Sequence, residues 1–474
     1  MNDPPADPVI HQGRWLCIAY AFPPINRSGT HRTLAFVRHL DRLGWDASVL
    51  TVQPRGEPID ETLLAKIPLG TRVVRSRWVH LLEAADRLRS LFRRKTTGRN
   101  SPPPLAAASR PRDSAGDRCG IKEIVSSLLT TPDSRVGWVP FALRAGLREI
   151  KRARPKVIYS TSPYASAHLI ALLLSAWRRI PWVADFRDPW SANPFRSSTP
   201  GLTDALEGWL ERLVLRRAAH VVYNTPTAAA EMQRRYPWIA PKCTTILNGI
   251  DPELFDAAQP IRTEPRDRFV LLHCGQFYGQ RSPHVWFDAL RTLQKEAPEV
   301  AARIRFISLG ATHYDGSPLE RMASEYGVGR IFSAVPSSSH QDAIALMLSA
   351  DALGLATSAG AGAHLQVPNK LFEYLGARRP ILATAAPDSP VRDILRQAHA
   401  DCVVCPQDDP AELARGLRYL ATRPAPADPA LWSGVERFHR DQQAAQLRAV
   451  FVQVSGNVRH CPPLPLVAPA PAPG

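Results

Sequence analysis

Short apolar runs alternate with amphipathic helical stretches along most of this chain, which is the pattern of a parallel sheet whose strands are connected by helices. The first apolar run, residues 15–21 (WLCIAYA), leads through a Pro-Pro turn and a glycine into residues 30–43, where Leu34, Val37 and Leu40 form an apolar face. The strands of this first series are predicted at 15–21, 46–52, 156–160, 182–186 and 220–224. Together they predict one doubly wound α/β domain.

The same pattern restarts after residues 248–255 (NGIDPELF). The strands of the second series are predicted at 269–274, 304–309, 351–356, 380–384 and 402–404. Between the two series, the polar stretch 258–268 contains two prolines and suits a linker between domains. We therefore predict a first Rossmann-like domain over residues 1–258, a second over 266–425, a C-terminal helix over 430–455 and a disordered proline-rich tail over 456–474.

Length and composition agree with a globular protein of two domains. A chain of 474 residues is longer than a single hydrophobic core usually supports, and its 45% hydrophobic and 22% charged residues are near the average. No run reaches the roughly 18 consecutive apolar residues that a membrane-spanning helix needs. Residues 1–12 lack the basic, apolar and small-residue order of a secretory signal, so a cytoplasmic location is expected.

The positive charge is concentrated in the first half of the chain. Residues 1–258 hold 37 Lys+Arg against 23 Asp+Glu, which gives +14 of the total +16. Within an insertion near 87–118, the stretch 87–112 has eight Lys or Arg and no acidic residue. This pattern is typical of a segment on an anionic membrane surface, which predicts a peripheral location at the inner face of the plasma membrane. The alternative is a solvated helix followed by a flexible linker over 96–114.

The turns after the strands of the first domain hold the first group of candidate site residues, because ligands of an open parallel sheet bind at the carboxyl ends of its strands. Gly29 precedes a helix and lets the backbone approach an anion or a sugar, although a simple turn capped by Ser28 explains it equally well. The candidate sugar-binding side chains follow two neighbouring strands and are Thr161, Ser162, Asp185, Arg187 and Asp188. In the structural alternative, Asp188 caps a turn and Arg187 neutralises Asp185.

The second domain offers a set of residues suited to a phosphate. Gly275 ends a strand, and Arg281 follows shortly before a helix, where its forked donors suit a phosphate. Pro368 places Lys370 at a helix N-terminus, where the helix dipole disfavours a cation unless an anion compensates it. Glu373 lies three residues further and therefore on the same face. The pair is either a plain ion pair or a shared site, with Lys370 toward phosphate and Glu373 toward hydroxyl groups.

Five segments resemble, in this order, the hallmarks of family-4 glycosyltransferases of the GT-B fold, particularly the branch that makes bacterial surface polysaccharides. They are FPPINRSGTHR, SPYASAHLIALLL followed by DFRDPW, ILNGIDPELF, CGQFYGQRSP and VPNKLFEYLGARRPILA. The resemblance extends roughly over residues 15–420. It implies two Rossmann-like domains that face each other across a cleft, with the donor nucleotide held mainly by the second and the acceptor mainly by the first.

The resemblance also implies roles for single residues. By match to the family's motifs, Glu373 bonds the donor ribose, Arg281 and Lys370 hold the diphosphate, and Gly29 belongs to the loop that faces the donor phosphate and sugar. The expected donor-binding residues are Gly29, Gly275, Arg281, Asn369, Lys370, Leu371 and Glu373, and those expected to act in catalysis are Arg281, Lys370 and Asp185.

Two positions depart from the family's pattern. Leu365 stands where many relatives have a glutamate near the donor sugar, and Thr161 stands where they often have a histidine. His168 lies seven residues after Thr161 on an apolar helix and is predicted to be structural.

The prediction from the sequence is a retaining, hexosyltransferase-type enzyme that moves a sugar from a nucleotide-diphosphate sugar to a lipid-linked or oligosaccharide acceptor in surface polysaccharide biosynthesis. No cofactor or metal is expected, because Arg281 and Lys370 can neutralise the leaving diphosphate and no Asp-x-Asp stands at a strand end. A nucleotide-sugar epimerase on the same fold is one alternative. A nucleic-acid-binding protein is the other, although the chain has no helix-turn-helix, zinc-finger or aromatic RNA-binding motif, so no nucleic-acid partner is expected.

Overall fold

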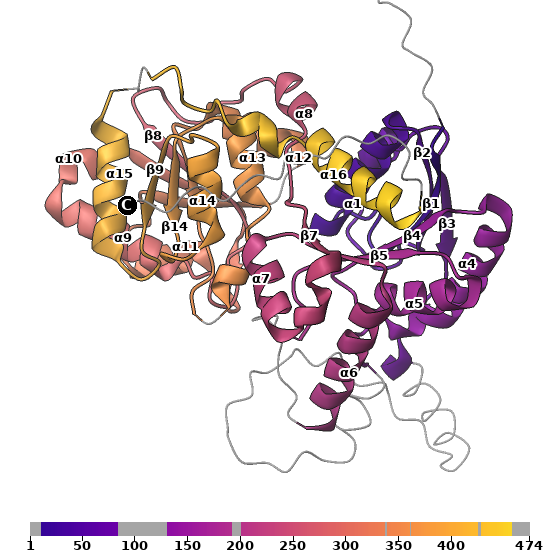
Figure 1. Cartoon of the computed structure of the whole chain (residues 1–474). Helices are drawn as coiled ribbons and strands as arrows, with labels where there is room; N and C mark the ends of the chain where they lie inside the picture. The colour runs from indigo at the N-terminus through magenta and orange to yellow at the C-terminus, as the bar shows by residue number, and fades with distance from the viewer. Residues whose placement is uncertain are drawn as a thin grey trace, which may run out of the picture.

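The computed structural model of this chain describes residues 11–83, 130–191, 201–336, 339–360, 362–424 and 428–456. Two parallel sheets, each covered by helices, form two domains that lie side by side (Figure 1). This arrangement confirms the predicted α/β class with two Rossmann-like domains. The basic stretch 87–112 and the tail from residue 457 onward lie outside the described residues, so what the sequence predicts for them stays a prediction.

The first domain is built on a seven-stranded parallel sheet in the order β3-β2-β1-β4-β5-β6-β7. Its strands are β1 (Gly13–Ala19), β2 (Trp45–Val52), β3 (Arg72–Ser76), β4 (Val157–Thr161), β5 (Trp182–Arg187), β6 (His220–Tyr223) and β7 (Cys243–Thr245). The helices include α1 (Ser28–Arg42), α4 (Val139–Ala153), α5 (Ser166–Arg178), α6 (Leu202–Arg217) and α7 (Pro226–Arg235). All five predicted strands are present. The edge strands β3 and β7 were not predicted, because both are short and mostly half-buried and neither forms a continuous apolar run.

The second domain is built on a six-stranded parallel sheet in the order β12-β9-β8-β13-β14-β15. Its strands are β8 (Phe269–Gly275), β9 (Ile304–Gly310), β12 (Phe332–Pro336), β13 (Ala352–Leu355), β14 (Ile381–Thr384) and β15 (Cys402–Cys405), and a small hairpin pairs β10 (His313–Tyr314) with β11 (Ser317–Pro318). The helices are α8 (Pro252–Asp256), α9 (His284–Glu296), α10 (Pro298–Ala301), α11 (Leu319–Glu325), α12 (His340–Ser349), α13 (Lys370–Ala377), α14 (Pro390–Gln397) and α15 (Pro410–Thr422). Only the half-exposed edge strand β12 was missed among the strands of this sheet.

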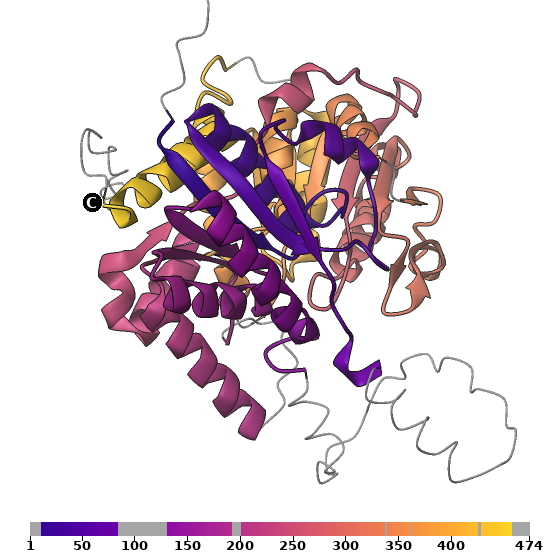
Figure 2. The ribbon, with the colours of Figure 1, turned by 90° about the vertical axis from the view of Figure 1, so that its right-hand side faces the viewer.

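The last helix returns to the first domain. The short 3-10 helix η5 (Val435–Phe438) and α16 (Arg440–Val454) occupy the region predicted as a separate C-terminal helix, and α16 lies beside α1 (Figures 1 and 2). The Phe451 ring lies 5.3 Å from the Trp15 ring and 5.4 Å from the Trp45 ring, all three in one buried cluster. The predicted domain boundaries are corrected accordingly, because α16 completes the core of the first domain.

Two segments of chain therefore cross between the domains, and they pair with each other. The Ile250 amide donates to the Phe438 carbonyl at 2.8 Å, and the Arg440 amide donates to the Ile250 carbonyl at 2.9 Å. Gly249 allows this approach, since a Cβ there would lie only 2.8 Å from the Phe438 carbonyl oxygen. No helix in the described part of the chain is long and apolar enough to cross a membrane.

We expect Phe451→Ala to destabilise the protein by about 3–5 kcal/mol, because it empties a fully buried ring site between two tryptophans. Urea unfolding followed by tryptophan fluorescence measures the change. Gln453→Ala is the matched control, since Gln453 is exposed on the same helix. Equal unfolding curves for both variants would contradict the assignment of α16 to the first domain's core.

Candidate functional site

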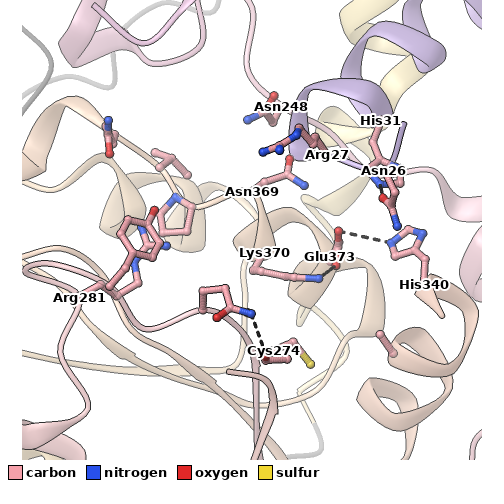
Figure 3. A pocket seen from close by; sticks show the side chains of 18 of the residues that line it. Asn26, Arg27, His31, Asn248, Cys274, Arg281, His340, Asn369, Lys370 and Glu373 are labelled. Atoms are coloured by element: carbon pink, nitrogen blue, oxygen red, sulfur yellow. Dashed lines mark hydrogen bonds and ion pairs between the residues drawn. The ribbon is translucent and has the colours of Figure 1, made fainter. Parts of the chain in front are cut away.

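A cleft of about 530 Å³ lies between the two domains, at the carboxyl ends of strands from both sheets (Figure 3). Its wall from the first domain includes Asn26, Arg27, His31, Arg187, Asp188 and Asn224. Its wall from the second domain includes Gly275, Gln276, Tyr278, Arg281, His340, Asn369, Lys370 and Glu373. The cleft is thus lined mostly by polar and charged side chains, with cations on both walls.

Lys370 and Glu373 form an ion pair at the start of α13. The Lys370 Nζ lies 2.7 Å from the Glu373 Oε2, and only 31% and 14% of their side chains are exposed. Burial would raise the pKa of Glu373, but Lys370 and His340 bring it well below its ordinary value. Burial would lower the pKa of Lys370, but Glu373 raises it above its ordinary value. Both groups are therefore charged around neutral pH, and the glutamate compensates the cation at the helix N-terminus as the sequence indicated.

Two histidines from opposite domains meet beside this pair. The His340 Nε2 lies 3.5 Å from the Glu373 Oε1, and the His340 ring centroid lies 4.9 Å from that of His31 (Figure 3). His31 in turn lies 3.2 Å from the Asn26 side-chain oxygen. Burial, His340 and Arg440 lower the pKa of His31 to about 4, so its ring is neutral at pH 7. Sequence reasoning missed both histidines, although His31 belongs to one of the motifs that it singled out.

Arg281 lies on the same wall, in a tight turn between β8 and α9. The Tyr278 and Arg281 backbones exchange two hydrogen bonds of 3.1 and 3.0 Å, and the guanidinium lies 5.0 Å from the centre of the Tyr278 ring. Burial lowers the pKa of Arg281, but a guanidinium keeps its charge at any pH near neutral. Its buried Nε has no hydrogen-bond partner in the described part of the chain. The side chain therefore has unused donor capacity for an anion.

The remaining donor-site predictions divide into two groups. Gly275 and Asn369 line the cleft, and Gly275 has a φ of +136°, a conformation that residues with a side chain rarely adopt. Leu371 does not line the cleft, because its side chain points into the core of the second domain and is fully buried. Gly29 does not line it either. A Cβ at Gly29 would lie 2.9 Å from the Arg187 Nη1. The glycine therefore leaves room for Arg187, which does line the cleft.

Asp185 has a different position from the one predicted for it. It is fully buried beneath the cleft, where Arg32 on α1 donates to both of its carboxylate oxygens at 3.0 and 3.2 Å. The Tyr159 hydroxyl and the Thr161 hydroxyl donate to the same carboxylate. Burial would raise the pKa of Asp185, but Arg32 lowers it below its ordinary value. The structure therefore corrects the prediction that Asp185 and Thr161 contact sugar: both belong to a buried hydrogen-bond network.

Arg32 extends this network to the segment that crosses between the domains. Its guanidinium donates to the Ile246 carbonyl at 2.9 Å, the Leu247 carbonyl at 2.7 Å and the Asn248 side chain at 3.2 Å. Its side chain is only 3% exposed. A residue of α1 thus joins the end of β5 to the segment that crosses between the domains.

Of the other residues predicted after β4 and β5, Arg187 and Asp188 reach the cleft and Ser162 does not. Ser162 donates to the Phe186 carbonyl. Arg187 has a φ of +48°, and the pairing of β5 with β6 shifts register between Asp185 and Arg187. This bulge turns Arg187 and Asp188 toward the cleft, while Asp185 stays in the sheet. Burial raises the pKa of Asp188, and Arg187 acts against that rise.

The two positions that depart from the family's pattern, Thr161 and Leu365, are both structural here: the Thr161 hydroxyl donates to the buried Asp185 carboxylate. The Leu365 side chain is buried, and its carbonyl accepts a hydrogen bond of 2.8 Å from the Thr225 hydroxyl across the domain interface. Next to it, the His364 carbonyl accepts one of 2.6 Å from Thr227. His168 is fully buried with its Nδ1 2.8 Å from the Ser160 hydroxyl, and burial lowers its pKa to about 4. This agrees with the structural role predicted for it.

Both halves of the chain match known protein families. Residues 104–254 match the family described as Glycosyltransferase Family 4, and residues 268–423 match Glycosyl transferases group 1. A comparison with curated protein sequences gave no match.

Several solved structures share the fold. A glycosyltransferase from Rickettsia africae ESF-5 has a TM-score of 0.60 at 12% identity, over 94% of this chain and 98% of its own. Anabaena Alr3699/HepE in complex with UDP-glucose has a TM-score of 0.57 at 14% identity, over 92% and 99%. A putative UDP-N-acetylglucosamine 2-epimerase from Listeria monocytogenes has a TM-score of 0.53 at 10% identity, over 94% and 97%. At these identities the likeness establishes the fold alone.

We expect Arg32→Ala to destabilise the protein by about 3–5 kcal/mol, because it leaves the Asp185 carboxylate buried without its cation. Arg42→Ala is the control on the same helix. Arg42 pairs with Glu253, but both side chains are more than half exposed, so its loss is expected to cost less than about 1 kcal/mol. Urea unfolding of Arg32→Ala, Asp185→Ala and the double variant Arg32→Ala/Asp185→Ala measures the coupling, and Arg42→Ala is unfolded beside them. A double variant as unstable as the sum of the two single ones would show that the pair is not coupled.

Proposed function

We propose that this chain, which belongs to glycosyltransferase family 4 and has the GT-B fold, transfers a sugar from a nucleotide-diphosphate donor to a lipid-linked or saccharide acceptor. Glycosyl transfer follows from the family. The donor, the acceptor and the stereochemical course are our inference from the cleft.

The observation that carries the proposal is the cationic wall of the second domain, where Arg281 and the Lys370–Glu373 pair line one cleft. Breaking a sugar–phosphate bond develops negative charge on the leaving diphosphate, and fixed cations that are already in place lower the barrier to it. The Arg281 Nε has no hydrogen-bond partner among the described residues, and Lys370 stands at the start of α13, where the helix N-terminus adds its own positive end. Glu373 accepts hydrogen bonds and is suited to the hydroxyls of a ribose.

The wall of the first domain is suited to the acceptor. Arg187, Asp188 and Asn224 offer both donors and acceptors of hydrogen bonds to sugar hydroxyls. Asp188, whose pKa burial raises, is the carboxyl group on this wall that is best placed to exchange a proton with an acceptor hydroxyl. We propose retention of anomeric configuration, because family members that share these motifs retain it.

The proposal of a nucleotide-diphosphate sugar has support from the fold neighbours, since the Anabaena protein was solved with UDP-glucose. We also propose that the acceptor belongs to surface-polysaccharide synthesis at the inner face of a membrane. The excess of basic residues in the first half of the chain supports attraction to anionic headgroups.

The competing reaction is epimerisation of a nucleotide sugar. Free nucleoside diphosphate released only when an acceptor is present identifies transfer. Interconversion of two nucleotide sugars without any acceptor identifies an epimerase and overturns the proposal.

We expect Lys370→Ala and Glu373→Ala each to reduce transfer about ten- to a hundredfold, the effect of losing a charge-assisted hydrogen bond of roughly 1.5–3 kcal/mol. Initial rates of nucleoside diphosphate release measure it. Arg415→Ala and Glu412→Ala are matched controls, because this pair has the same spacing in the same domain but is exposed and distant from the cleft. If the cleft pair and the control pair gave equal rates, the donor site would lie elsewhere.

We expect transfer to continue in excess EDTA, because side-chain cations rather than a metal ion neutralise the diphosphate in the proposed mechanism. Rates before and after chelation, with magnesium or manganese added back, give the test. Loss of activity that either metal restores would show that the mechanism needs a divalent ion.

A further inference from the structure

The first domain also brings a cation to the cleft, and the proposed donor site does not use it. Arg27 precedes α1 and lines the cleft on the wall opposite Lys370 and Arg281 (Figure 3). Its Nε donates to the Glu57 Oε2 at 2.5 Å. Across all the residues that the structure describes, this is the one side-chain hydrogen bond of Arg27, and 43% of the side chain is exposed. The two Nη groups are therefore available to a ligand.

A buried carboxylate holds Arg27 in this orientation. The Glu57 side chain is 1% exposed, and besides Arg27 it accepts from the Tyr20 hydroxyl at 2.8 Å and from the Arg135 Nη2 at 3.1 Å. Arg135 is itself fixed, since its guanidinium lies 4.2 Å from the centre of the Trp78 ring and 5.0 Å from that of Tyr20. Such support fixes the plane of the Arg27 guanidinium before any ligand binds.

The backbone beside Arg27 favours an anion as well. α1 is a 15-residue helix in which the N-cap residue makes no side-chain cap hydrogen bond with the described residues, and its first turn has no acidic residue that would compensate the positive end of its dipole. A guanidinium with Nε engaged still presents two Nη groups, and these suit two oxygens of one phosphate. Arg27 and the first turn of α1 together have the chemistry of a phosphate site.

This site lies on the wall of the cleft opposite the two cations that are proposed to hold the donor diphosphate. Arg281 and Lys370 already supply two cations from the second domain, whereas Arg27 and all of its supporting residues belong to the first. A cation on the opposite wall is suited to a second anionic group that enters from the acceptor side. Saccharides carried on polyprenol lipids are joined to them through phosphate, which is a group of this kind.

We propose that Arg27, positioned by Glu57, binds a phosphate group of the acceptor, so that the enzyme selects phosphate-linked saccharides over neutral ones. This inference rests on the proposed function, since it takes the second domain's cations as the donor site.

Thermal unfolding with defined probes tests the proposal without knowledge of the natural acceptor. Each protein is saturated in turn with UDP, GDP or ADP, and then receives hexose 1-phosphates or the free hexoses. We expect a nucleoside diphosphate to raise the wild-type midpoint, and hexose 1-phosphates but not hexoses to raise it further. Shifts are taken from each variant's own unliganded midpoint, so a loss of stability in a variant does not affect the comparison.

The variants assign the second shift to one wall of the cleft. Arg27→Gln is expected to keep the nucleotide shift and lose the phosphate-dependent one, and Arg27→Lys to keep part of it, because lysine retains the charge without the fork. Glu57→Gln is expected to weaken the phosphate-dependent shift alone. Lys370→Ala is expected to lose the nucleotide shift alone. Arg55→Gln is the control, since Arg55 is an exposed arginine two residues before Glu57, and it should change neither shift.

Three outcomes overturn the proposal: a phosphate-dependent shift that survives in Arg27→Gln, a nucleotide shift that disappears in Arg27→Gln, or no phosphate-dependent shift in the wild type. The second outcome would assign Arg27 to the donor. By contrast, absence of any nucleoside diphosphate shift in the wild type indicates failure of the proposed function itself. Once an acceptor that the enzyme turns over is known, Arg27→Gln should raise the KM for that acceptor about tenfold or more and leave the KM for the donor unchanged.

Discussion

The arrangement of this cleft depends on one buried ion pair, between Arg32 and Asp185. The carboxylate stands at the end of the first domain's β5, and the guanidinium that binds it also holds the carbonyls of residues 246 and 247. A charge in this position is costly to bury and is retained only when every donor and acceptor around it is satisfied. Because the pair satisfies them all, the end of β5, the start of α1 and the crossing segment have one fixed relation. Most of the cleft residues that the first domain contributes lie on these three elements.

Both walls of the cleft carry cations, and each wall holds its cations in a different way. The cations of the second domain lie at a helix start and in a tight turn, and each is partly neutralised or desolvated. Arg27 of the first domain is held by a buried carboxylate in a network of its own. An anionic ligand between the two walls would interact favourably with the cations of both. The charges of the two walls thus favour an anionic ligand in the cleft between the domains.

Most of the fold and part of the site could be predicted from the sequence. What could be predicted differs from what could not for a physical reason. Strand ends, the helix start at Lys370 and the pairing with Glu373 follow from local periodicity and spacing, so they were predictable. His340 was missed and Asp185 was misassigned because their partners lie far along the chain. A carboxylate at a strand end has the same local sequence whether its partner is a sugar or an arginine about 150 residues away. The docking of α16 was missed for the same reason.

The return of α16 also determines when the first domain can be complete. Synthesis proceeds from the N-terminus, so strands β1 to β7 leave the ribosome long before Phe451, which covers Trp15 and Trp45. Until then the apolar face beside α1 is open to solvent, and the second domain is finished earlier than the first. Early termination of translation would release a protein with an incomplete first-domain core.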